Sequence, residues 1–221
     1  MLNKNDVKCF SSLTDKINVH YYAKFLDKYK ADKYYSILEE KLVYNSAEDS
    51  KVVVYGKTFD IPRKQVAYGE PGTYYRFAGN TVKAKSWNEE DNEDNKKDIV
   101  CTIIKNIKHK VELFTRQQFN FVLINRYADG NQMIHHHQDD ERELGKDPTI
   151  VGVSLGAERD VQFKPYHFIP AKIPGKINLE LGNGSIFVML PPTNDFWSHS
   201  IPKRADVKTP RISLTFRYLH L

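Results

Sequence analysis

The sequence predicts an α+β fold in which a double-sheet β barrel carries helices on its outside. Two segments in the first half repeat apolar residues at helical spacing, and the pattern changes to short strands after Phe119. Glycine and proline separate those strands. The 221 residues are enough to bury a sizeable core, and they correspond to one domain, with or without an N-terminal extension.

The first half predicts two helices and one hairpin. Residues 18–42 repeat apolar side chains at helical spacing and predict the first helix. Residues 51–59 predict a strand that enters a tight turn, because Val52-Val53-Val54 runs into Tyr55-Gly56. Residues 87–97 are dense in charged and amide side chains and predict an exposed loop. The second helix, over 98–114, has an apolar stripe made of Ile99, Val100, Ile103, Ile104, Ile107 and Val111.

The second half predicts short strands. They are expected at 119–127, 150–156, 160–164, 177–181, 185–190 and 211–219. Gly182-Asn183-Gly184 predicts a turn between two of them. No internal repeat or low-complexity linker interrupts this pattern.

The net charge and the cysteine content indicate the kind of partner and the compartment that the protein suits. A net charge of +5 and a pI near 9.0 permit a polyanionic partner and suit a basic soluble protein equally well. No apolar run approaches a membrane span, and the N-terminus lacks a hydrophobic signal segment. Cys9 and Cys101 form no spaced framework, which favours a reducing compartment, nuclear or cytoplasmic.

Two histidines and one carboxylate form a candidate metal site. Residues two apart in an extended chain point to the same side, and among His135, His136 and His137 only the last has a carboxylate, Asp139, at that spacing. His199 follows a predicted strand and can return to the first pair in a barrel. Such a set is the facial triad of non-haem Fe(II) oxygenases. The alternatives are ordinary surface or core histidines, and zinc, whose structural sites usually recruit thiolates.

The last predicted strand offers a candidate anion site. Period 2 predicts a polar face made of Arg211, Ser213, Thr215 and Arg217. An edge strand with a solvated face has the same pattern. Arginine suits a carboxylate-bearing partner, however, because its planar fork matches a carboxylate in bidentate geometry. Asn125 and Tyr127 share one face at the end of another predicted strand and could contact the same anion, or could be an ordinary polar strand end.

Several longer segments resemble one family. They are Val54-Tyr55-Gly56-Lys57, IPRKQVAYGEPGTYYRFAG, FNFVLINRYADG, HQDDERELG, VSLGAERD, GSIFVMLPPTNDFWSHSIP and PRISLTFR. They resemble the AlkB family of Fe(II)- and 2-oxoglutarate-dependent nucleic-acid demethylases, and within it the animal branch that repairs double-stranded DNA. The resemblance implies a jelly-roll (double-stranded β-helix) core over 119–221. It also implies a nucleotide-recognition region with a hairpin finger over 49–118 and an N-terminal helical extension over 1–48.

The resemblance assigns cofactors to the two candidate sites. Iron would be bound by His137, Asp139 and His199, with dioxygen as a further co-substrate. The implied 2-oxoglutarate contacts are Asn125, Tyr127, Arg211, Ser213, Thr215 and Arg217. Arg211 would meet the distal carboxylate and Arg217 the end nearer the metal. Ser213 departs from the asparagine that the family usually has there, which leaves both arginines in place.

The resemblance also implies a nucleic-acid surface. The substrate-binding residues would be Val54, Tyr55, Gly56, Lys57, Arg63, Tyr75, Arg76, Phe77, Asp140 and Glu141. Tyr55, where the family usually has phenylalanine, would be a finger inserted into the duplex in place of a flipped base. Tyr75 and Phe77 would stack on that base, and Asp140 and Glu141 would lie near its exocyclic amine. Phosphate contacts would come from Arg63, Lys64, Lys203, Arg204 and Lys208.

The implied function is oxidative demethylation of 1-methyladenine and 3-methylcytosine in DNA. The damaged base would be flipped out of a duplex by a monomeric enzyme, and the hydroxylated methyl group would leave as formaldehyde. One alternative keeps the chemistry and changes the substrate to RNA or a protein side chain. The other is a module that binds damaged nucleic acid without turnover. The presence of all three iron ligands and both arginines argues against the second alternative.

Overall fold

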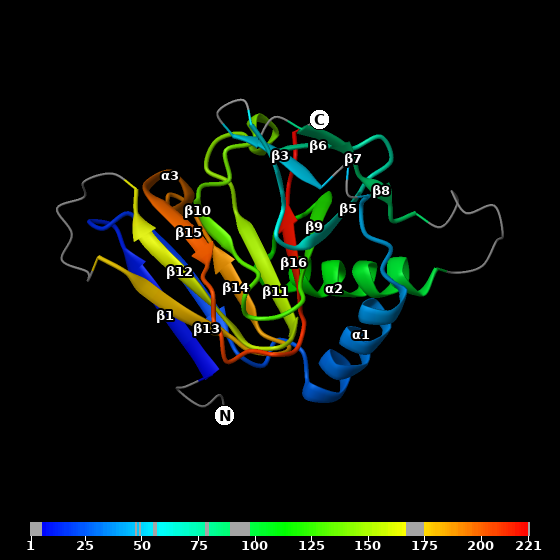
Figure 1. Ribbon diagram of the computed structural model, residues 1–221. Helices are drawn as coiled ribbons and strands as arrows, with labels where there is room; N and C mark the ends of the chain where they lie inside the picture. The colour runs from blue at the N-terminus through cyan, green and yellow to red at the C-terminus, as the bar shows by residue number, and fades with distance from the viewer. Residues whose placement is uncertain are drawn as a thin grey trace.

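The computed structural model describes residues 6–46, 48, 50–54, 57–77, 80–88, 98–166 and 175–220. They form two sheets with the two long helices, α1 and α2, on the outer side of the larger one (Figure 1). The larger sheet has eight strands in the order β1-β2-β14-β11-β16-β9-β5-β8, and the smaller has four in the order β10-β15-β12-β13. The predicted α+β fold with a jelly-roll core and outer helices is confirmed.

The elements have the following bounds. The larger sheet contains β1 (Val7–Ser12), β2 (Ile17–Tyr22), β5 (Lys64–Gly69), β8 (Lys85–Ser86), β9 (Phe121–Tyr127), β11 (Ile150–Gly156), β14 (Ile186–Met189) and β16 (Arg211–Arg217). The smaller sheet contains β10 (Ile134–His137), β12 (Arg159–Pro165), β13 (Ile177–Leu181) and β15 (Trp197–Ile201). The helices are α1 (Lys28–Lys41), α2 (Ile99–Thr115) and the one-turn α3 (Thr193–Phe196), with a 3-10 turn at Arg142–Leu144.

Two hairpins lie outside these sheets. β3 (Lys51–Val54) pairs with β4 (Lys57–Asp60), as predicted for residues 51–59, and β6 (Tyr74–Phe77) pairs with β7 (Asn80–Lys83). β3 contacts β7, and both hairpins lie at the same end of the molecule (Figure 1).

Both long helices begin at aspartate caps. The Asp27 carboxylate accepts a hydrogen bond from the Lys30 main-chain nitrogen at 2.8 Å, and that of Asp98 accepts one from Val100 at 2.7 Å. The predicted stripe of α2 is buried except for Ile99, which is 46% exposed at the first position of the helix. No helix in the described part of the chain is long and apolar enough to cross a membrane.

The predicted helix over 18–42 is wrong in its first part. Residues 17–22 form β2, and the helix begins only at Lys28. Ile17, Val19 and Tyr21 are buried and alternate with half-buried neighbours, which is the period of a strand. β2 pairs with β14 and so extends the larger sheet. The division of the chain into three regions stays a prediction, although β2 and β5 both pair with strands of the predicted core region.

The hydrophobic core has two main layers, separated by the larger sheet. One layer packs α1 and α2 against the sheet and includes Ile212, Leu214 and Phe216 of β16. The other fills the space between the two sheets. The alternate residues of β16, from Arg211 to Arg217, therefore face the smaller sheet, as the period-2 pattern predicts. The candidate site residues meet in the space between the two sheets, here named the cleft.

Candidate metal and anion site

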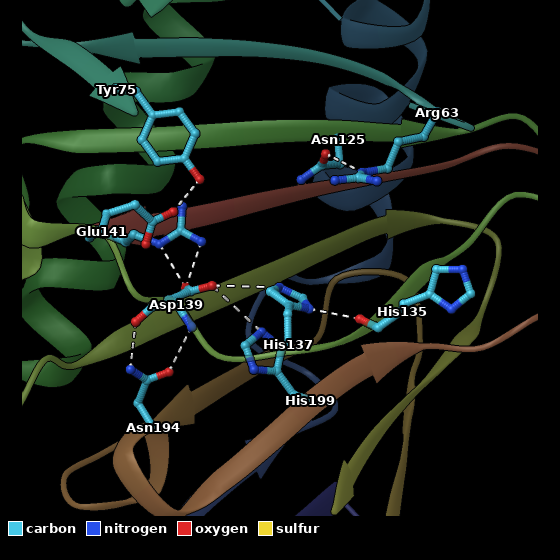
Figure 2. Close-up of polar contacts among 10 residues, drawn as sticks. Arg63, Tyr75, Asn125, His135, His137, Asp139, Glu141, Asn194 and His199 are labelled. Atoms are coloured by element: carbon cyan, nitrogen blue, oxygen red, sulfur yellow. Dashed lines mark hydrogen bonds and ion pairs between the residues drawn. The ribbon is translucent and has the colours of Figure 1, made fainter. Parts of the chain in front are cut away.

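Three side chains from two distant segments of the chain, the end of β10 with the loop after it and β15, meet in the cleft between the sheets. β10 and β15 pair in a register that places His137 opposite His199, and the ring centroids are 4.3 Å apart. Asp139 Oδ1 lies 3.6 Å from His137 Nε2 and 3.9 Å from His199 Nε2 (Figure 2). Two imidazole nitrogens and one carboxylate oxygen lie within 4.8 Å of one another. This is the donor set of a facial iron triad.

The neighbouring histidines show why His137 faces the cleft. Its Nδ1 lies 2.8 Å from the His135 carbonyl oxygen, a contact that orients the ring so that Nε2 lies 3.6 Å from Asp139 Oδ1. His136 belongs to the other side of β10, where its ring nitrogens lie 3.4 Å and 3.2 Å from the Ser198 and Ser200 hydroxyls. Alternation along β10 thus turns His136 away from the cleft and His137 toward it.

Asp139 is held in its charged form by Arg217. Its buried Oδ2 accepts hydrogen bonds from Arg217 Nη2 at 2.6 Å and from Nε at 2.9 Å. Burial alone would raise the pKa of Asp139, but Arg217 and the two histidines lower it to about 2. Burial lowers the pKa of His199 to about 3, because the charged ring would lose its water. At neutral pH the site offers a carboxylate and a neutral imidazole, as metal binding requires.

Asn194 fixes the main chain of Asp139. Its Oδ1 accepts a hydrogen bond from the Asp139 nitrogen at 3.1 Å, and its Nδ2 donates to the Asp139 carbonyl oxygen at 2.8 Å (Figure 2). Asn194 lies in α3, directly before β15, so it ties the loop of the carboxylate to the strand of His199. The sequence offered no signal for this role, because it depends on a contact between distant segments.

A buried cation lies at the other end of the cleft. Arg211 is 2% exposed and donates from Nη2 to Ser154 Oγ at 2.8 Å. Its Nε and Nη1 have no hydrogen-bond partner among the described residues. Burial lowers the pKa of Arg211 to about 10, so it remains protonated at neutral pH. A buried cation with two unused donors favours a bound anion.

A row of polar side chains crosses the larger sheet beside Arg211. The strand pairings place Gln65, Asn125, Ser213 and Ser154 next to one another on β5, β9, β16 and β11. All four are buried, and Gln65 Nε2 has no partner in the described part of the chain. Thr215 lies half-buried, one step nearer the metal end. Gln65 and Ser154 could not be singled out from the sequence, because one polar residue in an apolar strand makes no pattern.

Tyr75 and Glu141 connect the β6–β7 hairpin to the metal end. The Tyr75 hydroxyl donates to Glu141 Oε1 at 2.5 Å (Figure 2). Tyr75 is buried and stacks on Phe121 with ring centroids 4.9 Å apart, and the Arg217 guanidinium lies 5.7 Å from its ring. Burial raises the pKa of both Tyr75 and Glu141. Asp140, by contrast, is exposed to solvent.

The basic residues predicted to contact nucleic acid differ in their surroundings. Arg63 donates from Nε to Asn125 Oδ1 at 2.8 Å, so two residues predicted to bind different ligands are bonded to each other. Arg76 is exposed and pairs with Glu143 at 3.1 Å. Arg204 is surrounded by carboxylates, namely Glu158, Asp160 and Asp206. The exposed lysines of the predicted set are Lys57, Lys64, Lys203 and Lys208.

The finger itself lies outside the described residues. β3 and β4 pair in a register that brings Val54 opposite Lys57. Tyr55 and Gly56 between them are not described, and neither are the side chains of Val54 and Phe77. The finger and the second stacking residue therefore stay predictions.

The two ends of the cleft fit one class of enzyme. Two imidazoles and a carboxylate suit Fe(II), and the unused donors of Arg211 suit the far carboxylate of a dicarboxylate. Arg217 Nη1 also has no partner among the residues that the structure describes. A jelly-roll core with this triad and this arginine defines a non-haem iron(II) oxygenase with a dicarboxylate co-substrate.

The chain belongs to the 2OG-Fe(II) oxygenase superfamily, whose family model matches residues 19–217, and within it to the AlkB family. It is a dioxygenase whose cofactors are Fe(II), 2-oxoglutarate and dioxygen. The chain is 39% identical over 199 residues to "DNA oxidative demethylase ALKBH2" of Mus musculus, a match that covers 89% of this chain and 78% of that protein. The Homo sapiens protein of the same name is 38% identical over 203 residues, or 90% of this chain and 73% of that protein.

A solved structure supports the fold. The chain is similar to "The structure of OsALKBH1" with a TM-score of 0.57. The match covers 96% of this chain and 100% of that chain at 13% sequence identity. At this identity the likeness concerns the fold alone.

Proposed function

We propose that the protein oxidatively demethylates alkylated bases in DNA, with 1-methyladenine and 3-methylcytosine as its substrates. The observation that supports this most strongly is that one cleft combines the His–Asp–His triad with a buried arginine whose donors are open. The substrate is inferred from the similarity to the mouse and human proteins named DNA oxidative demethylases.

Each end of the cleft has its own task in this reaction. His137, Asp139 and His199 hold the iron, and Arg217 keeps the carboxylate charged and oriented. The distal carboxylate of 2-oxoglutarate binds Arg211, and the remaining contacts are Asn125, Tyr127, Ser213, Thr215 and Arg217. When bound, iron with 2-oxoglutarate and dioxygen supplies the oxidation of the methyl carbon, while 2-oxoglutarate becomes succinate and carbon dioxide. The surrounding side chains position these groups and exclude water.

The acidic residues beside the metal suit the charge of the substrate. Methylation of a ring nitrogen on the pairing edge of adenine or cytosine gives a base that is positively charged at neutral pH. Glu141 is half-buried, and its Oε2 has no hydrogen-bond partner among the described residues. Asp140 is exposed next to it. These carboxylates would attract the cationic base and favour it over an unmethylated one.

The base reaches this site by flipping out of a duplex. A methyl group on the pairing edge blocks Watson–Crick pairing and makes the base easier to extrude. Tyr55, between β3 and β4, fills the vacated stack, while Tyr75 and Phe77 contact the flipped base. Lys57, Arg63 and Arg76 support the strand, and the protein acts as a monomer in the nucleus or the cytoplasm. RNA with the same lesions is the alternative substrate, because a single strand requires no finger.

Mass spectrometry on a matched set of substrates tests the proposal. Duplex DNA, single-stranded DNA and RNA with one 1-methyladenine, and a methylated peptide, are each incubated with the iron-loaded protein, 2-oxoglutarate and air. We expect loss of the methyl group from DNA, and no loss with the His199→Ala variant. Faster turnover of RNA or of the peptide would change the substrate class. If the protein binds methylated DNA and the DNA loses no mass, the protein is a damage-binding module and not a demethylase.

A further inference from the structure

Arg159 is a fully buried arginine at the start of β12 that belongs neither to the metal triad nor to the predicted co-substrate contacts. Alternation along β12 turns Arg159, Val161 and Phe163 toward the larger sheet. Phe163 lies beside His199, with ring centroids 6.2 Å apart. β12 therefore runs from the metal end of the cleft, at Phe163, to the anion end, at Arg159.

The Arg159 guanidinium bridges main-chain carbonyls of two segments. Nη1 donates to the Asp129 oxygen at 2.8 Å, and Nη2 donates to the oxygens of Gln132 at 2.8 Å and Pro202 at 2.6 Å. Asp129 and Gln132 belong to the loop that follows Tyr127 at the end of β9, and Pro202 follows β15. One side chain thus ties the loop after β9 to the end of β15.

The same two segments also approach each other through their backbones. Gly130 donates to the Val207 oxygen at 2.9 Å and accepts from the Arg204 nitrogen at 2.8 Å. A Cβ at Gly130 would lie 1.6 Å from the Arg204 carbonyl oxygen, so only glycine permits this approach. The loop after β9 is therefore held from two directions, and Arg159 is the side chain that holds its carbonyls.

Arg159 also contacts Tyr127 directly. Its guanidinium carbon lies 5.5 Å from the centre of the Tyr127 ring, and that of Arg211 lies at the same distance of 5.5 Å. Burial lowers the pKa of Arg211, and the repulsion from Arg159 lowers it further. The anion end thus contains two buried positive charges around one tyrosine, which strengthens the field that an arriving carboxylate meets.

We propose that Arg159 is a positioning residue for 2-oxoglutarate: it holds Tyr127 and the loop after β9 in place and adds a second positive charge behind Arg211. The inference rests on the proposed use of Arg211 and Tyr127 as co-substrate contacts. It also predicts that loss of Arg159 weakens the binding of 2-oxoglutarate and not that of iron, because the contacts of Arg159 lie at the anion end.

Arg126 provides a matched control. It precedes Tyr127 in β9 but faces the opposite side of the sheet, where its Nε donates to Glu39 Oε2 at 2.8 Å and its Nη2 donates to Oε1 at 2.5 Å. Glu39 belongs to α1. Removal of Arg126 therefore breaks a bidentate pair between a helix and the same strand without touching the cleft.

Calorimetric titration of 2-oxoglutarate into the iron-loaded full chain, without oxygen, separates binding from turnover. Arg159→Met should weaken 2-oxoglutarate binding by about 10–100-fold, the range for residues that orient a ligating group, and leave iron affinity unchanged. Arg159→Lys should weaken it by a smaller factor, because an ammonium keeps the charge but cannot bridge the three carbonyls. If Arg159→Met does not fold, the 2-oxoglutarate affinity of Arg159→Lys tests the proposal instead. Arg126→Met should lower the melting temperature and leave 2-oxoglutarate affinity unchanged.

Two results would overturn the proposal. One is wild-type 2-oxoglutarate affinity in the folded Arg159 variants. The other is equal weakening in Arg126→Met, which would mean that the effect is a general loss of stability. Binding without oxygen does not depend on the nucleic-acid substrate, so failure of the DNA proposal and failure of the Arg159 proposal give different results.

Discussion

The two ends of the cleft differ in how far the protein satisfies its own charges. At the metal end, the Asp139 carboxylate and the Arg217 guanidinium pair at 2.6 Å, and Asn194 binds the main chain of Asp139. At the anion end, Arg211 bonds only Ser154 among the described residues and keeps two donors open, while Arg159 adds a further positive charge.

The difference indicates that folding alone orders the metal end, whereas the anion end needs a ligand to compensate its charge. The metal end is fixed by internal pairs, so its ligand geometry exists before iron arrives. The anion end holds a buried cation whose desolvation is compensated only when an anion binds. Binding of 2-oxoglutarate should therefore stabilise the fold at the anion end far more than it reorganises the metal end.

The largest effect is expected at the metal end. Asp139→Ala should abolish turnover and lower the free energy of unfolding by about 3–5 kcal/mol, because Arg217 is left buried without a partner. His199→Ala should also abolish turnover but with a smaller loss of stability, since the half-buried His199 is neutral at pH 7 and its removal leaves no charge without a partner. Formaldehyde release and urea unfolding measure the two quantities. If Asp139→Ala is as stable as the wild type, the buried charge of Arg217 needs no partner and the prediction is wrong.

At the anion end, removal of the buried charge should weaken ligand binding without a loss of stability. Arg211→Ala should weaken 2-oxoglutarate binding by about 2 kcal/mol or more, through the loss of a charge-assisted bidentate pair. Without cofactors, this variant should be as stable as the wild type or more so, because an unpaired buried charge is removed. Arg211→Lys should restore only part of the affinity. Unchanged affinity in Arg211→Ala would place the anion elsewhere, and a large loss of stability would make Arg211 structural.

Asn194→Ala should give a smaller effect, confined to the metal end. Iron affinity should fall about tenfold, the lower end of the range for groups that orient a ligand, while 2-oxoglutarate affinity of the iron-saturated protein should stay close to wild type. Asn183→Ala is the control, since its amide donates to Asp32 at 2.7 Å, away from the cleft. Equal losses of iron affinity in both variants would mean that Asn194 acts through general stability.

Tyr75→Phe should give the smallest effect, because it touches neither cofactor. Loss of the hydrogen bond to Glu141 should lower kcat/KM on methylated DNA about fivefold, which corresponds to about 1 kcal/mol. Iron and 2-oxoglutarate affinities should stay the same. Steady-state kinetics with separate titrations of each cofactor distinguish this outcome from a disturbed metal end, in which iron affinity would fall as well.

The sequence predicts the features that depend on local periodicity. It does not predict the features that depend on which strands pair. Alternation on β16 and the two-residue spacing of His137 and Asp139 are local, and the structure places these residues as the pattern predicts. The helix predicted from residue 18 was wrong, because Tyr21, Phe25 and Tyr29 are four apart and imitate a helical face. Pairing of β2 with β14 overrides that local signal.

Other residues leave no local pattern at all. Asn194 binds the main chain of Asp139, and Arg159 binds carbonyls at Asp129, Gln132 and Pro202. Both roles exist only after distant segments meet. A buried polar residue that binds backbone groups across the fold therefore has to be found in the structure.

The most direct test asks whether both ends of the cleft serve one reaction on DNA. A duplex oligonucleotide with one 1-methyladenine is incubated with the iron-loaded protein, and succinate, formaldehyde and repaired adenine are quantified in the same sample. The wild type should give equal amounts of all three, and none of them should form with Asp139→Ala. Repair without 2-oxoglutarate, or succinate without formaldehyde and repaired adenine, would contradict the assignment of the cleft to oxidative demethylation.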